Sequence, residues 1–328
     1  MRDNYYSLLK GIAIIAVVII HTAYAGYFPS SSAAFMRQIV TFAVGLFFFI
    51  SGFFVSDRMK SYSGVMGGAK RILIPYIVWS VLWFLETTLR GTQPVDTWKI
   101  VNTLFFGGAF FPLYFLIVMV ELKLITPFLL RHLAKPNYCI WKDWVLLITP
   151  LTYVVFYIFQ YKTHQVPLVQ ESIFPTWLIF YYFGILYKKK LIHISNISCI
   201  AGVLLGIYFM GLETAYILRK TEMVVFAVSM VKYSSAFYTL FLCILLMNNY
   251  ESIGSNIIVK LGEYSFGIYL LHIPLKKYLI EYPFAIIGFD GPLYQPIVVI
   301  ATLIITFSIV WFLNKTLPDK FCRTLGII

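Results

Sequence analysis

The sequence predicts an all-α protein whose helices cross a lipid bilayer. Of its 328 residues, 60% are hydrophobic and only 12% are charged, whereas a soluble domain usually carries about 25% charged residues. The mean hydropathy is +0.82. Aromatic residues make up 19% of the chain, which is typical of membrane helices with aromatic belts at both interfaces. Composition therefore excludes a water-soluble globular fold.

Ten apolar segments reach or approach the roughly 17–25 residues that a helix needs to cross the hydrocarbon core. Too little sequence remains between them for a further domain. We therefore expect one transmembrane domain over residues 1–328 and no appended soluble domain. The ten segments cover residues 8–25, 39–55, 72–89, 113–130, 144–161, 173–187, 197–212, 233–247, 261–275 and 296–314.

Basic residues concentrate in alternate connections between these segments, which predicts that both termini are cytoplasmic. The run Lys188-Lys189-Lys190 is a strong local anchor for this orientation. The excess of 26 Lys and Arg over 14 Asp and Glu follows from the same rule, so we expect no nucleic-acid partner. The four cysteines show no CxxC spacing, and the sequence predicts neither a disulfide framework nor a metal site from them.

The first apolar segment, LLKGIAIIAVVIIH, carries one cation and one imidazole. Lys10 lies at its cytoplasmic end, and His21 follows eleven residues later, toward the outer side. In a helix the two residues are about 16 Å apart along the axis. Taken alone, Lys10 is typical of a positive-inside anchor, and His21 is typical of a residue wetted at the membrane interface. The segment by itself leaves a functional role for both residues open.

The second segment contains a pair of small residues, and the third contains a proline near its start. Ser51-Gly52 in LFFFISGFF favours close helix packing, and no G-x-S-x-G elbow marks Ser51 as a nucleophile. The third segment, ILIPYIVWS, is expected to begin near residue 72. Pro75 then falls in its first turn, where the missing N–H of proline leaves no hydrogen bond unmade.

Basic residues flank these two segments on the predicted cytoplasmic side. Arg58 follows the second segment, and Lys70-Arg71 precede the third. Together with Lys10, these residues predict either a pocket for phosphate groups or contacts with lipid headgroups. Composition does not separate the two interpretations.

Titratable residues within apolar segments are functional candidates, because a bilayer penalises charge. Glu86 lies near the outer end of the third segment, and Glu121 lies near the middle of the fourth. Lys123 is only two residues from Glu121, so the two side chains point to different faces of a helix. His272 lies near the outer end of the ninth segment, at a depth similar to that of His21. This similarity predicts a cavity shared by the two histidines.

The order of these motifs resembles the acyltransferase-3 family of integral membrane O-acyltransferases. The similarity rests on LLKGIAIIAVVIIH, VGLFFFISGFF, AKRILIPYIVW, YFLIVMVELKLITPFL and YSFGIYLLHIPL, which span residues 5–275 in order. Two positions depart from the family pattern. Lys10 stands where the family usually has arginine, which keeps the charge and loses the bidentate fork. Gly68 stands where the family often has the first of two arginines spaced three apart.

The resemblance implies a multi-pass enzyme of a bacterial plasma membrane. It implies transfer of an acyl group, usually acetyl, from cytoplasmic acetyl-CoA to a hydroxyl of a cell-surface polysaccharide or lipid-linked glycan. In this scheme His21 is the general base, Glu121 is a second catalytic group, and Glu86 and His272 contact the acceptor. The donor phosphates are held by cations, namely Lys10, Arg58, Lys70 and Arg71. No metal cofactor is expected.

Two other functions are compatible with many apolar helices and intramembrane charges. A transporter or flippase for a lipid-linked sugar is the main alternative, although the sequence shows no inverted repeat and few helices broken by Gly or Pro at corresponding positions. A nonenzymatic membrane scaffold leaves the ordered set of motifs unexplained. Turnover of a thioester by purified protein in detergent distinguishes the enzyme from the transporter.

Overall fold

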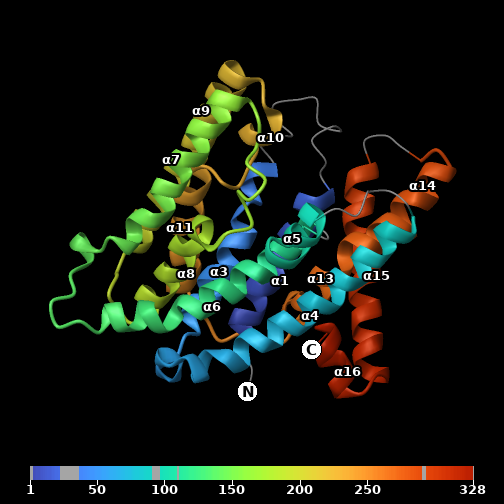
Figure 1. Cartoon of the computed structure of the whole chain (residues 1–328), viewed down its shortest axis with the longest axis horizontal. Helices are drawn as coiled ribbons and strands as arrows, with labels where there is room; N and C mark the ends of the chain where they lie inside the picture. The colour runs from blue at the N-terminus through green and yellow to red at the C-terminus, as the bar shows by residue number, and fades with distance from the viewer. Residues whose placement is uncertain (1–2, 23–36, 91–96, 109–110, 290–292, 328) are drawn as a thin grey trace. The chain divides into compact units, whose positions relative to one another are not determined.

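A computed structural model describes residues 3–22, 37–90, 97–108, 111–289 and 293–327 (Figure 1). All regular structure in these residues is helical, as the sequence predicts. The helices are α1 (Asn4–Thr22), α3 (Phe42–Phe53), η2 (Asp57–Lys60), α4 (Tyr62–Leu89), α5 (Thr97–Phe105), η3 (Phe111–Leu113), α6 (Tyr114–Leu133), η4 (Ile140–Lys142), α7 (Val145–Thr163), α8 (Phe174–Lys188), α9 (Asn196–Thr221), α10 (Val224–Ala227), α11 (Tyr233–Asn248), α12 (Ile257–Glu263), α13 (Ser265–Lys276), η5 (Lys277–Glu281), α14 (Tyr282–Ile286), α15 (Tyr294–Thr316) and α16 (Asp319–Leu325).

Each of the ten predicted apolar segments contains a helix, but not every segment is one long span. Five helices among the described residues are long and apolar enough to cross a membrane: α1, α4, α7 with the turn before it, α9 and α15. The segment predicted over 261–275 consists of two helices, α12 and α13, which meet at Tyr264. It therefore remains a prediction that the chain crosses the membrane ten times and that both termini are cytoplasmic.

The third predicted helix begins ten residues earlier than expected. α4 starts at Tyr62, where the Ser61 hydroxyl accepts a hydrogen bond from the backbone N–H of Gly64 at 3.3 Å. Pro75 consequently lies in the interior of α4 and not in its first turn, so that prediction is wrong. A proline there removes the hydrogen bond to the carbonyl of Arg71, which neighbouring helices in a membrane protein can compensate. The N-terminal cap and the packing of η2 and α6 against α4 explain the longer helix.

The chain folds into two compact units, which are described separately. Unit 1 comprises Met1–Phe47, Asn196–Met230 and Ser234–Ile328, and unit 2 comprises Phe48–Ser195 and Val231–Tyr233. In unit 1, α1 packs against α12, α13 and α15, and α13 packs against α15. In unit 2, α4 packs against α6, and α8 packs against both α6 and α7.

Two glycines allow α3 and α8 to pack closely in unit 2, because each glycine lies against the backbone of the other helix. A Cβ at Gly52 of α3 would lie 1.9 Å from the carbonyl oxygen of Tyr181 in α8. A Cβ at Gly184 of α8 would lie 2.1 Å from the carbonyl oxygen of Phe49. The two helices thus touch through their backbones, and this geometry confirms the interpretation of Ser51-Gly52 as a packing motif.

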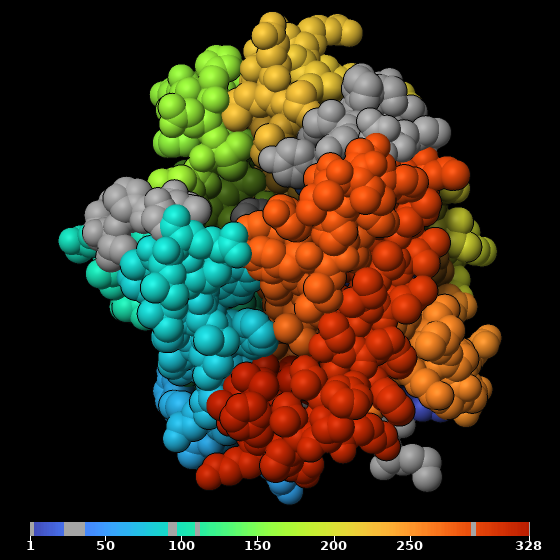
Figure 2. Space-filling model, turned by 90° about the vertical axis from the view of Figure 1, so that its right-hand side faces the viewer, coloured from blue at the N-terminus to red at the C-terminus, as the bar shows by residue number. Residues whose placement is uncertain are grey.

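The last long helix, α15, has one buried and one exposed face. Its buried positions include Thr302 and Thr306, whereas large apolar side chains lie on its exposed face. The C-terminal residues, coloured orange to red, form part of the surface that Figure 2 presents. The exposed residues are Ile297, Ile300, Ile304, Trp311 and Phe312. An apolar surface of this kind is unfavourable in water and suits contact with lipid.

Candidate active site

The two candidate histidines lie side by side in unit 1. His21 is in the last turn of α1, and His272 is in α13. Their ring centroids are 5.2 Å apart, with an angle of 47° between the ring planes. His272 is completely buried, whereas His21 is partly exposed. The helices α1 and α13 pack against each other, which brings together two residues separated by more than two-thirds of the chain.

Hydrogen bonds define the tautomer of His272. Its Nδ1 lies 2.7 Å from the carbonyl oxygen of Tyr269 and 3.2 Å from that of Ile268. A carbonyl oxygen only accepts, so Nδ1 carries the hydrogen and Nε2 presents a lone pair. This Nε2 is buried and forms no hydrogen bond within the described part of the chain. The interior of unit 1 therefore contains an unused hydrogen-bond acceptor next to His21.

Two hydroxyl groups on α15 share this property. The Oγ1 atoms of Thr302 and Thr306 are buried and form no hydrogen bond with any residue that the structure describes. Both threonines lie on the helix that packs against α13. Buried polar groups in proteins are nearly always hydrogen-bonded. The two hydroxyl groups are therefore exceptions to this rule, as is Nε2 of His272.

A lysine fixes the end of the helix that carries His21. The Nζ of Lys276 donates a hydrogen bond to the carbonyl oxygen of His21 at 2.7 Å and forms an ion pair with Glu281 at 2.9 Å. The last carbonyls of a helix lack partners within the helix, and a cation is favourable there. Lys276 follows His272 by four residues, one helical turn, and it lies just beyond the segment predicted over 261–275. The spacing HIPLK was the signal that could have identified it.

Glu121 has a defined structural contact in unit 2. Its Oε2 accepts a hydrogen bond from the backbone N–H of Phe174 at 2.8 Å, at the first residue of α8. A carboxylate at a helix N-terminus satisfies a free amide and is favoured by the helix dipole. His21 belongs to unit 1, so the contact of Glu121 with His21 or with substrate remains a prediction.

The predicted donor-binding cations lie on three elements. Lys70 and Arg71 are exposed residues of α4, and Arg58 is exposed on η2, all in unit 2. Lys10 is partly exposed on α1 of unit 1, so a pocket that combines it with the other three remains a prediction. α1 is one continuous helix through Lys10 and His21, which supports the axial separation of about 16 Å. Lys123, on α6, lies against α4 near Gly68.

Glu86, the other predicted acceptor-binding residue, forms a local ion pair. Its Oε1 lies 2.8 Å from the Nε of Arg90, one turn later near the end of α4. Pairs at this spacing on an exposed helix usually contribute only about 0.3–0.5 kcal/mol. The ion pair with Arg90 is therefore a sufficient structural contact for the Glu86 carboxylate. Its binding of a substrate remains a prediction.

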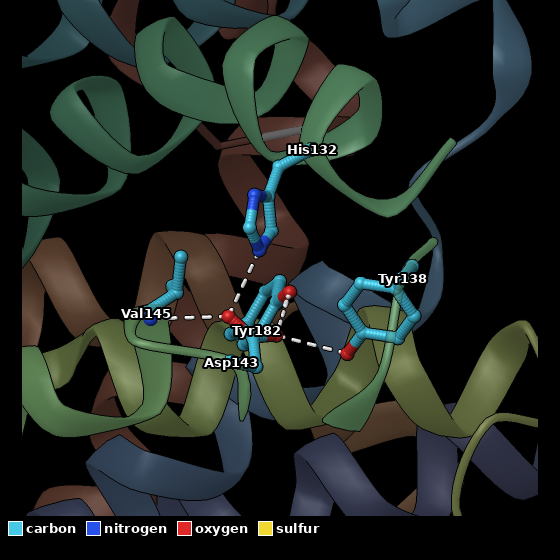
Figure 3. Close-up of polar contacts among 5 residues, drawn as sticks. All are labelled: His132, Tyr138, Asp143, Val145 and Tyr182. Atoms are coloured by element: carbon cyan, nitrogen blue, oxygen red, sulfur yellow. Dashed lines mark hydrogen bonds and ion pairs between the residues drawn. The ribbon is translucent and has the colours of Figure 1, made fainter. Parts of the chain in front are cut away.

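A buried carboxylate that sequence analysis missed connects α6, α7 and α8 (Figure 3). Asp143 accepts hydrogen bonds through Oδ1 from His132 Nε2 at 2.9 Å and from the Val145 N–H at 3.0 Å. Its Oδ2 accepts from the hydroxyls of Tyr138 at 2.8 Å and Tyr182 at 2.5 Å. Burial and the neighbouring carboxylate raise the pKa of Tyr138 to about 12. All lone-pair positions of Asp143 are thus engaged, which fits a structural connection and leaves no free base.

The four cysteines, Cys139, Cys199, Cys243 and Cys322, are all free thiols, and only Cys139 is exposed. The described residues include no group of three or more His, Cys, Asp or Glu side chains arranged to hold a metal ion.

Comparison with known protein families shows a match over most of the chain. The family model Acyl_transf_3, described as an acyltransferase domain, matches residues 3–311. No curated protein and no solved structure matches the chain. The matched region contains both histidines and all the other predicted site residues. The chain belongs to the acyltransferase-3 family, and it is a membrane acyltransferase.

Proposed function

We propose that this protein transfers an acetyl group from cytoplasmic acetyl-CoA to a hydroxyl of a cell-surface polysaccharide or a lipid-linked glycan, in the plasma membrane of a bacterium. The observation that carries the proposal is the contact between His21 and His272 inside unit 1. Two imidazoles at 5.2 Å, one of them completely buried, are costly in an apolar protein unless they serve chemistry.

The reaction requires one proton acceptor. As the acceptor hydroxyl attacks the thioester carbonyl, neutral His21 takes the hydroxyl proton, and a new C–O bond forms. The C–S bond then breaks, and the leaving thiolate of CoA takes the proton back from the imidazolium. No proton or electron is gained or lost overall, so the transfer needs no redox cofactor. Glu121 is proposed as a second catalytic group, which binds a sugar hydroxyl or orients His21.

The donor and the acceptor approach His21 from opposite sides of the membrane. Lys10, Arg58, Lys70 and Arg71 bind the donor phosphates on the cytoplasmic side through charge-assisted hydrogen bonds. The slender pantetheine arm then follows α1 over the roughly 16 Å between Lys10 and His21. The acceptor enters from the outer side, where Glu86 and His272 contact it. The unused polar atoms of His272, Thr302 and Thr306 support binding of a compound rich in hydroxyl groups.

The purified protein in detergent tests the proposed function. We expect it to consume acetyl-CoA and release free thiol when a glycan acceptor is added, because the reaction needs no gradient across a membrane. Release of thiol is measured with a chromogenic disulfide, and the acetylated glycan is identified by mass spectrometry. Absence of thioester turnover, combined with movement of a lipid-linked sugar across vesicles, would show that the protein is a transporter.

A substitution at His272 tests its assignment to the acceptor site. Asparagine retains an N–H near the position of Nδ1 and removes the acceptor Nε2. We expect His272→Asn to raise the KM for the glycan acceptor about tenfold, the equivalent of one hydrogen bond to a polar ligand. The Kd for CoA stays unchanged. His272→Gln, which places an amide oxygen near the position of Nε2, is expected to recover part of the loss. An unchanged acceptor KM in the asparagine variant would contradict the assignment.

A further inference from the structure

A pocket of about 380 Å³ lies at the C-terminal ends of α3 and α8 in unit 2. Phe53, Leu130 and Ile185 supply an apolar wall, and Lys188 and Lys189 supply two cations. The volume falls within the range of sites for small molecules. None of the residues considered so far for donor binding lines this pocket, although Arg58 follows directly after one lining residue.

Lys188 is the least neutralised cation of the pocket. Its Nζ lies 4.7 Å from the centroid of the Phe53 ring, and it forms no ion pair with any residue in the described ranges. Lysines at the end of a helix also stabilise its free carbonyls, but that role requires no cavity. A cation that lines a pocket beside an aromatic ring is instead suited to an anionic ligand.

The single carboxylate of the pocket does not cancel this charge. Asp57 Oδ1 lies 3.1 Å from Lys60 Nζ and 3.7 Å from Lys189 Nζ. The hydrogen bond from Lys60, followed by the charge of Lys189, lowers the pKa of Asp57. Two lysines therefore contact this carboxylate, and with Lys188 the pocket and its rim hold three lysines and one carboxylate, so they remain positively charged.

One element that lines the pocket, η2, also contacts α4, the helix that carries Lys70 and Arg71. The turn η2, which contains Asp57 and Arg58, packs against both α4 and α6. A Cβ at Gly64 in α4 would lie 1.9 Å from the carbonyl oxygen of Arg58, so this turn rests directly on the start of α4. Lys70 follows Gly64 by six residues, about 9 Å along the helix.

We propose that this pocket binds the phosphorylated nucleotide end of the thioester donor, with Lys188 and Lys189 in contact with phosphate. This inference rests on the proposed function. A nucleotide combines a planar base, which suits the apolar wall, with phosphates, which form charge-assisted hydrogen bonds with lysine. The remaining phosphate-binding residues then act along the path from this pocket toward the pantetheine arm.

Binding measurements on the full-length protein in detergent micelles test the pocket. The probes are CoA and adenosine 3′,5′-bisphosphate, which represents the nucleotide end alone. We expect the double variant Lys188→Gln/Lys189→Gln to raise the Kd for both probes about tenfold, through loss of hydrogen bonds between charged groups. Lys190→Gln is the matched control, because Lys190 is an exposed neighbour that does not line the pocket. Its Kd values are expected to equal those of the wild type.

A second variant predicts a change in the opposite direction, which a folding defect does not produce. Asp57→Asn frees Lys60 and Lys189 from their carboxylate partner, so it is expected to lower the Kd for both probes about twofold. Equal Kd values for CoA in the wild type, the double variant and Lys190→Gln would overturn the assignment of the pocket. If acetyl transfer continues in the same samples, the proposed function stands and only the pocket assignment is lost.

A lipid headgroup offers the same phosphate chemistry, and a further measurement separates the two sources. Thermal unfolding is followed with and without phosphatidylglycerol in the micelles. The assignment to the nucleotide is overturned if neither soluble probe binds and phosphatidylglycerol raises Tm only when Lys188 and Lys189 are present. It is supported if the soluble probes bind and the lipid raises Tm equally in the wild type and the double variant.

Discussion

Replacement of His21 by alanine is expected to lower the rate of acetyl transfer about 10²–10⁴-fold, the usual contribution of a general base. The variant loses the group that takes the proton from the attacking hydroxyl. The residue is partly exposed in the last turn of α1, so its replacement is expected to leave the apolar packing of the helix largely intact. The rate is measured as thiol release from acetyl-CoA at saturating acceptor. Binding of CoA is expected to be unchanged, because the phosphate-binding cations lie elsewhere.

The matched control is His193→Ala. His193 is an exposed histidine in the connection between α8 and α9, and its loss is expected to leave the transfer rate at the wild-type value. Membrane insertion of both variants is checked by their elution as monodisperse particles in detergent. A His21→Ala protein that is correctly inserted and transfers acetyl at a near-normal rate would rule out His21 as the base. Another group, with His272 the nearest candidate, would then have to accept the proton.

The helical fold could be predicted because its signal is local. Runs of apolar residues long enough to span a bilayer must form helices, since backbone groups have no other hydrogen-bond partners in lipid. The start of α4 and the division of α12 from α13 at Tyr264 were not predicted. Both depend in part on packing partners that are distant in sequence, such as α6 against α4 and the carbonyl of Ser7 against Gly262.

The candidate site was predictable in part for a related reason. His21 and His272 stand out because imidazoles are rare in apolar segments. The predicted membrane topology also places both of them near the outer side of the membrane. Asp143 was missed because its four partners come from separate elements, and no spacing in the sequence links them. Lys276 was missed because lysine near the end of an apolar segment is ordinary. Only the three-dimensional structure shows that its ammonium group bonds to the His21 carbonyl.

Replacement of Lys276 by methionine is expected to lower kcat about 100-fold with little change in the KM for acetyl-CoA. Methionine keeps the length and the apolar stem of lysine but donates no hydrogen bond to the His21 carbonyl. The end of α1 then loses one of its contacts with α13, and a displacement of about 1 Å in a catalytic group is enough for a loss of this size. Stability also falls, because the largely buried Lys276 side chain loses its ion pair with the partly exposed Glu281 carboxylate.

Two further variants separate the positioning of His21 from general stability. Glu281→Gln breaks the same ion pair but leaves the hydrogen bond from Lys276 to His21, so it should lower Tm and largely preserve kcat. Lys277→Met removes a neighbouring exposed lysine and should change neither quantity. If Lys276 acts only as a structural residue, Glu281→Gln and Lys276→Met will lower kcat in proportion to their loss of Tm. A kcat loss confined to Lys276→Met, and recovered in part by Lys276→Arg, identifies the bond to the His21 carbonyl as the contact that positions the base.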